Sequence, residues 1–170
     1  MDPRRIGRSR TGSPLYTPAE RRRRDASVWT LVQGILAPVQ FAIFLVSLAL
    51  VIRFLVTGEG LAAATASVLV KTAALYAIMV TGSIWENEVF GRYLFAPAFF
   101  WEDVVSMLVL ALHTAYLAAA LTDAIGPREQ MWLALAAYAS YVVNAAQFLW
   151  KLRLARLDGA RDTAPAGAAA

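Results

Sequence analysis

The chain has 170 residues, of which 59% are hydrophobic and 16% are charged, and its formal net charge is +4. The hydrophobic share is higher and the charged share lower than in ordinary soluble domains, so lipid is the expected solvent, and this length allows only a small bundle of membrane helices. The sequence contains no cysteine and one histidine, which excludes disulfide frameworks, zinc fingers, iron–sulfur clusters and multi-histidine metal sites.

Residues 1–27 are polar and basic, and we interpret them as a mobile cytoplasmic tail. They include eight arginines, and Pro14 and Pro18 prevent a long helix. They lack the short apolar region and the cleavage site of a signal peptide. Because this basic segment adjoins a long apolar one, it favours binding to anionic lipid headgroups over binding to nucleic acid.

Four apolar segments follow, at about residues 28–56, 61–84, 101–121 and 131–150, and each is long enough to cross roughly 30 Å of hydrocarbon. Turn-forming residues separate the first pair ("TGEG") and the second pair ("GPRE"). The sequence therefore predicts an all-α polytopic membrane protein, with a four-helix transmembrane bundle over residues 28–157 and a disordered tail over 158–170. Eight basic residues precede the first span and four follow the last, so both termini are expected in the cytoplasm.

The connection between the second and third spans, "SIWENEVFGRYLFAPAFFWEDV" from Ser83 to Val104, combines acids with aromatic residues. Gly91 and Pro97 interrupt any simple amphipathic helix here, so we expect a structured aromatic loop at the cytoplasmic face, either re-entrant or lying on the membrane surface. Two simpler interpretations stay open: the aromatic residues form an interfacial belt, and Glu88 and Arg92 form an exposed pair.

Polar side chains also occur inside the predicted spans, where they are costly without a partner or a function. Lys71 lies near the middle of the second span, and His113 is at a similar depth in the third. Helical spacing places the other polar residues on shared faces. They are Gln33 with Gln40, Glu102 with Ser106 and His113, and Tyr141 with Asn144, Gln147 and Lys151. The residues alone thus indicate a polar interior, with aromatic surface beside acids that suits a large, flat, amphiphilic ligand and acid–base chemistry.

Five stretches carry a resemblance to a known family, and they are "PLYTPAERRRRDAS", "WTLVQGILAPVQF", "LVTGEG", "LYAIMVTGSIWENEVFGRYLFAPAFFWEDVVSMLVLALHTAYL" and "NAAQFLWKLRLARL". Together they resemble the 3-vinyl bacteriochlorophyllide hydratase family of bacteriochlorophyll biosynthesis, which has the older name 2-vinyl bacteriochlorophyllide hydratase. The resemblance implies addition of water to the C3 vinyl group of chlorophyllide a, or of a related magnesium chlorin, to give a 1-hydroxyethyl group. It also implies a photosynthetic, intracytoplasmic inner membrane as the location, and a substrate that carries a propionate.

Hydration of a vinyl group on a conjugated ring should begin with protonation of its terminal carbon, and it ends with loss of a proton from the attacking water to a base. We therefore hypothesise that Glu102, Asp103 and Glu86, in that order, are the acid–base candidates. His113 is a ligand to the chlorin magnesium, a proton relay or a structural residue. No cofactor or metal of the protein's own is needed. We hypothesise that Tyr93 or Asn144 orients the water and that Arg92 or Lys151 pairs with the propionate. The full set of residues hypothesised to bind the substrate is Trp85, Arg92, Tyr93, Phe99, Trp101, Asn144 and Lys151.

Two other functions are compatible with the same residues. A non-enzymatic tetrapyrrole-binding scaffold or carrier would explain the aromatic residues but would not need the acids. A proton or ion channel could use Lys71 and His113. Beyond the substrate and membrane lipid, the expected partners are other enzymes of the pathway, docked on the basic tails.

Overall fold

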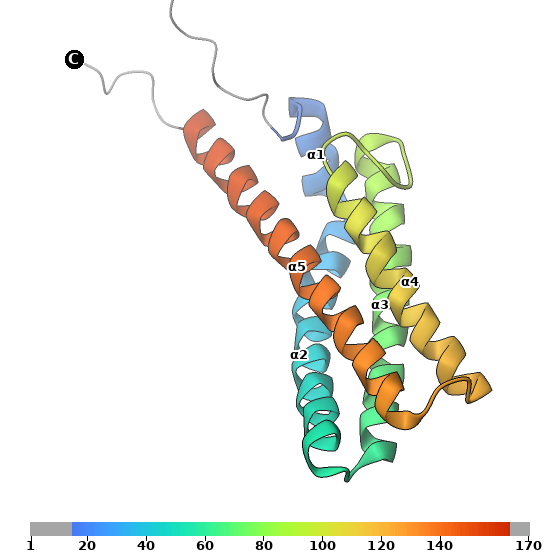
Figure 1. Ribbon diagram of the computed structural model, residues 1–170. Helices are drawn as coiled ribbons and strands as arrows, with labels where there is room; N and C mark the ends of the chain where they lie inside the picture. The colour runs from blue at the N-terminus through green and yellow to red at the C-terminus, as the bar shows by residue number, and fades with distance from the viewer. Residues whose placement is uncertain (1–14, 164–170) are drawn as a thin grey trace, which may run out of the picture.

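The computed structural model describes residues 15–163, with side chains to residue 157, and this part of the chain forms five helices and no strand (Figure 1). The helices are α1 (Pro18–Ala26), α2 (Val28–Thr57), α3 (Leu61–Phe90), α4 (Phe100–Thr122) and α5 (Pro127–Thr163). By length and composition, α2, α3, α4 and the part of α5 up to Leu157 can each cross a membrane. The predicted all-α bundle of four membrane helices is therefore confirmed.

Local sequence explains where the helices begin and end. The Ser27 hydroxyl accepts a hydrogen bond from the Trp29 amide at the start of α2. Gly58 ends α2 and Gly91 ends α3, and both have the left-handed φ of +75° that glycine adopts without steric cost. Because no proline occurs before Gly91, α3 continues through Gly82 and beyond its predicted end at Ile84, so Glu86 and Glu88 are helical.

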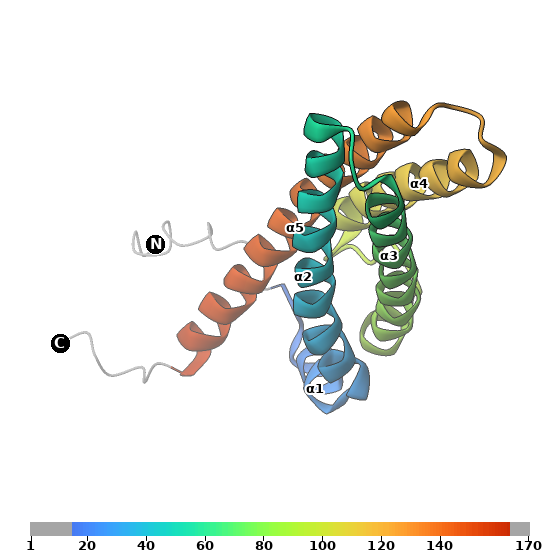
Figure 2. The ribbon, with the colours of Figure 1, turned by 90° about the horizontal axis from the view of Figure 1, so that it is seen from below.

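The bundle consists of two helical hairpins, α2 with α3 and α4 with α5, and the closest packing is within each hairpin. Figure 1 shows that α1, the connection from α3 to α4 and the C-terminal end of α5 lie at the same end of the bundle, which we call the loop end. Figure 2 shows from a second direction that the C-terminal half of α5 leaves the other helices. The large apolar side chains of this half are exposed, as lipid-facing residues should be; they are Leu149, Trp150, Leu152, Leu154 and Leu157.

Part of the basic segment before α2 is helical. Thr17 and Glu20 form a capping box at the start of α1, and Pro18 occupies a first-turn position where its missing N–H costs nothing. Residues 1–14 and 164–170 of the two predicted tails lie outside the described residues.

Candidate functional site

The nine residues between α3 and α4, 91–99, form a loop whose backbone amides donate hydrogen bonds to two carboxyl groups. Glu86 Oε1 accepts a hydrogen bond from the Ala96 amide at 2.5 Å, and Asp103 Oδ2 accepts one from the Phe95 amide at 2.7 Å. Phe95 has a φ of +60°, which is unfavourable for a bulky residue. The two carboxyl groups thus stabilise a strained turn that aims consecutive N–H groups at acceptors.

Glu86 and Asp103 also face each other. Their carboxyl groups are within hydrogen-bonding reach, although one belongs to the end of α3 and the other to the start of α4. Both side chains are buried, with 4% and 6% of their surface exposed. Two carboxyl groups can share a hydrogen bond only when one of them carries a proton. Two buried carboxyl groups this close favour keeping one proton between them, which suits the pair to donate a proton.

Glu102 points away from this pair, toward α5. Its Oε2 is 3.5 Å from Lys151 Nζ and has no hydrogen-bond partner among the described residues. Lys151 also donates to the Ala98 carbonyl of the loop. Asn144 donates to Ser106 Oγ at 2.6 Å and lies 3.5 Å from the Glu102 carbonyl. The predicted face of α4 thus meets the predicted polar face of α5, which brings Glu102, Asn144 and Lys151 together.

An aromatic cluster covers these acids at the loop end. Phe99 is 6% exposed and lies 5.7 Å from the Trp85 ring and 6.0 Å from the Phe148 ring, with the latter stacked. Tyr16 stacks on Phe90 at 5.8 Å and contacts Phe99 at 6.3 Å. Trp85 and Phe99, two of the predicted substrate-binding residues, therefore belong to one aromatic wall.

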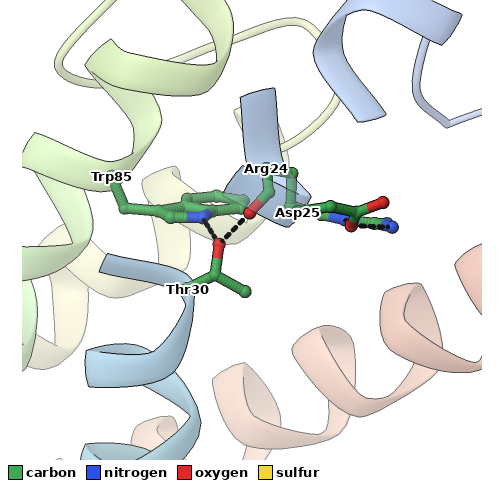
Figure 3. A network of polar contacts seen from close by, with 4 residues as sticks. All are labelled: Arg24, Asp25, Thr30 and Trp85. Atoms are coloured by element: carbon green, nitrogen blue, oxygen red, sulfur yellow. Dashed lines mark hydrogen bonds and ion pairs between the residues drawn. The ribbon is translucent and has the colours of Figure 1, made fainter. Parts of the chain in front are cut away.

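The segment around α1 closes over this wall. The Trp85 indole donates to Thr30 Oγ1 at 2.9 Å, and Thr30 donates to the Arg24 carbonyl at 2.6 Å (Figure 3). The Arg24 guanidinium lies 4.7 Å from the centre of the Tyr16 ring. Burial raises the pKa of the Tyr16 phenol, and the nearby guanidinium opposes that shift. A second contact to α3 is the hydrogen bond from Ser27 to Glu88 at 2.5 Å.

Three of the predicted substrate-binding residues lie apart from the acids. Tyr93 is 63% exposed, Trp101 is 68% exposed, and Arg92 is also exposed at the start of the loop. Their side chains therefore face the surroundings of the bundle, as residues of an interfacial belt do. The predicted pair of Glu88 with Arg92 is replaced by the bond between Glu88 and Ser27.

His113 lies deeper in the bundle and is fully buried. Its Nδ1 is 2.8 Å from the Val109 carbonyl, which can only accept, so Nδ1 carries a proton and Nε2 of the neutral ring presents a lone pair. Nε2 has no partner among the described residues. Within that part of the chain no cluster of three His, Asp or Glu side chains is placed to hold a metal ion, so His113 offers one nitrogen ligand and no more.

Several contributors to this site escaped the sequence interpretation. Tyr16, Thr30 and Phe148 complete the aromatic wall, and they come from segments that were interpreted as a tail or as plain membrane helix. The capping box beside Tyr16 was a usable signal, because it marks a helix start and so predicts that the neighbouring residues are ordered. Helical spacing was a signal for Phe148, because it lies four residues after Asn144 and three before Lys151, on the same face of α5.

The fold and the site together define an integral membrane protein with a sealed carboxyl cluster under an aromatic cover at one end of a four-span bundle. A family profile described as 2-vinyl bacteriochlorophyllide hydratase matches residues 16–154. The chain is 68% identical over 145 residues to the 2-vinyl bacteriochlorophyllide hydratase of Cereibacter sphaeroides, covering 85% of this chain and 89% of that protein. It is 67% identical over 150 residues to that of Rhodobacter capsulatus, covering 88% and 87%.

The chain therefore belongs to the 2-vinyl bacteriochlorophyllide hydratase family, and it is a hydro-lyase of bacteriochlorophyll biosynthesis, as the resemblance implied. No solved structure shows a significant match to it.

Proposed function

We propose that the chain adds water to the C3 vinyl group of chlorophyllide a, or of a related bacteriochlorophyllide, to give the 1-hydroxyethyl chlorin. The observation that carries this proposal is the similarity to two relatives named as 2-vinyl bacteriochlorophyllide hydratases, which extends over all four spans and the carboxyl cluster. The reaction changes no overall oxidation level, so no redox cofactor is required.

Glu86 and Asp103 supply the first proton in this mechanism. The proton that the two groups share is transferred to the terminal vinyl carbon, and the cation that forms on the adjacent carbon is delocalised into the macrocycle. The pair, which bears one negative charge while it holds the proton, then bears two, and the two loop amides that donate to it stabilise this charge. These contacts favour the pair over Glu102 as the general acid.

Glu102 acts in the second half of the reaction. The water that attacks the cation must lose a proton to a base. Glu102 Oε2 can accept this proton, because it is buried and has no hydrogen-bond partner among the described residues. Lys151 at 3.5 Å holds this side chain in position, and Asn144 offers an amide that can orient the water. The proton taken up by Glu102 returns to the pair or to solvent before the next turnover.

Aromatic residues of the loop end bind the pigment. Trp85 and Phe99 provide an aromatic wall for a flat macrocycle. His113 lies a rise of roughly 16 Å below Glu102 on α4, which is too deep to hold the magnesium of a ring whose vinyl group is at the acids.

The bundle is oriented with both termini and the loop end in the cytoplasm. The four basic residues after the last span and the basic residues of α1 are at this end, whereas the opposite turns are flanked by Arg53 and Arg128 alone. We place it in the photosynthetic inner membrane, where the basic segments contact anionic lipid and other enzymes of the pathway but not nucleic acid.

The test is to incubate membranes that contain the protein with chlorophyllide a in ¹⁸O-labelled water. The expected product absorbs at shorter wavelength and gains the mass of one labelled water. Membranes without the protein are the control. Pigment that is bound but not converted would contradict the proposal and favour the carrier.

A further inference from the structure

Lys71 is the cation that the fold leaves without an anion. It lies near the middle of α3, its side chain is 0% exposed, and its Nζ has no hydrogen-bond partner among the described residues. Its contact is with the face of the Tyr141 ring, whose centre is 3.8 Å from Nζ. A ring face offsets only part of the cost of removing an ammonium group from water, so this site requires an anion.

The three buried acids among the described residues are engaged elsewhere. Glu86 and Asp103 accept from the loop amides, and Glu102 pairs with Lys151. None of the ion pairs among the described residues includes Lys71. The anion must therefore come from a molecule that binds to the bundle.

The surroundings of Lys71 indicate the shape of that molecule. Tyr141 packs against Phe44 at 5.0 Å, and Phe44 packs against Tyr138 at 5.4 Å. Tyr138 lies 5.9 Å from the His113 ring, so Lys71 and His113 approach the same face of α5 one turn apart. A hollow of about 230 Å³ between α2 and α5 is lined by Phe44, Tyr138 and Val142, and it lies against the same aromatic rings. Aromatic walls beside a cation suit a flat, aromatic anion.

We propose that Lys71 binds the carboxylate of the tetrapyrrole substrate in the middle of the membrane. This inference rests on the proposed function, which supplies a substrate with a propionate and a magnesium ion. Lys71 Nζ matches the propionate, because it is a buried donor without a hydrogen-bond partner among the described residues. Lys151 does not have this role, since Glu102 and the Ala98 carbonyl already engage it.

The depth of the residues is consistent with this arrangement. Tyr141, which Lys71 contacts, and Lys151, which pairs with Glu102, are ten residues apart on α5, a rise of roughly 15 Å. A tetrapyrrole whose carboxylate is at Lys71 can extend along α5 over this distance toward the loop-end acids. The vinyl group then reacts at the loop end while the carboxylate is buried below it.

The experiment compares chlorophyllide a, a free acid, with its methyl ester, which has no negative charge. Binding to purified protein in detergent micelles is followed by the pigment's visible absorption, for wild type, Lys71→Met and Lys151→Met. Wild type is expected to bind the acid more tightly than the ester. Lys71→Met should weaken binding of the acid about 10- to 100-fold and leave the ester unchanged, as expected for loss of a charged hydrogen bond. Lys151→Met should retain the preference for the acid.

Equal affinity of wild type for acid and ester would overturn the inference, and so would equal weakening of both by Lys71→Met. If Lys71→Met does not fold, the affinities of wild type for the acid and the ester still test whether the protein recognises the carboxylate. Lys71→Gln then serves as the second variant. Because the readout is binding, a wild-type protein that prefers the acid but converts neither pigment would disprove the hydration and not the role of Lys71.

Discussion

The loop end and the middle of the bundle both bury charged and titratable groups, but they satisfy them differently. At the loop end, Glu86 and Asp103 accept from loop amides, and Glu102 is paired with the Lys151 cation, although its Oε2 accepts no hydrogen bond. In the middle, Lys71 Nζ and His113 Nε2 have no hydrogen-bond partner among the described residues. Groups that the chain satisfies hold its own parts together, whereas groups that it leaves unsatisfied are suited to a ligand. Substitutions in the two regions should therefore have opposite effects on stability.

The largest expected effect is on catalysis at the loop end. Asp103→Asn keeps an acceptor for the Phe95 amide but removes the acid with which Glu86 shares a proton. We expect the hydration rate to fall about 10²- to 10⁴-fold, the usual contribution of a general acid, with little change in the helical circular dichroism. The rate is measured from the absorption change of chlorophyllide a.

Glu86→Gln is the matched variant on the other side of the pair, because glutamine can still accept from the Ala96 amide. It should lower the rate by a similar factor. Normal turnover in either variant would mean that the pair holds the loop and does not supply the proton.

The second effect compares the two lysines by the same substitution. Lys151→Met leaves the buried Glu102 without its cation and should lower the free energy of unfolding by about 1–3 kcal/mol, a range that allows for the partial exposure of this pair. Lys71→Met removes a buried unpaired charge and should raise it by about 1–3 kcal/mol. Denaturant unfolding of pigment-free protein in micelles measures both. Changes of the same sign would show that the two regions do not differ as described.

A smaller effect is expected for Asn144→Leu, which removes the hydrogen bond to Ser106 and the amide proposed to orient water. The hydration rate should fall roughly tenfold, the equivalent of one hydrogen bond. Gln147→Leu, on the same helix, is the control, because the Gln147 Oε1 atom has no partner to lose. If both variants slow the reaction equally, general packing of α5 explains the loss.

The smallest effect should come from Arg92→Gln. Arg92 is exposed at the start of the loop, so its removal should change the rate and the affinity for chlorophyllide a by less than about twofold. A large loss of affinity for the free acid in this variant would indicate that the substrate carboxylate binds at the surface of the loop and not at Lys71.

Much of this architecture could be predicted from the sequence, because long apolar stretches bounded by glycine and proline determine the spans. Helical spacing also predicted the face of Glu102 and the face of Asn144 and Lys151, which the structure shows to be in contact. The approach of Glu86 to Asp103 could not be predicted in this way. It depends on how a loop with a left-handed Phe95 turns, and no periodicity encodes that turn.

The position of Glu86 and Asp103 also bears on how the protein is made. Glu86 belongs to the first hairpin and Asp103 to the second, so the two carboxyl groups meet only when the second hairpin has been synthesised and has packed against the first. Under the proposed mechanism, catalytic competence is therefore acquired at assembly rather than at insertion. Two halves that are produced separately and divided within residues 91–99 would each insert without activity, and the recovery of hydration on co-expression would report their association.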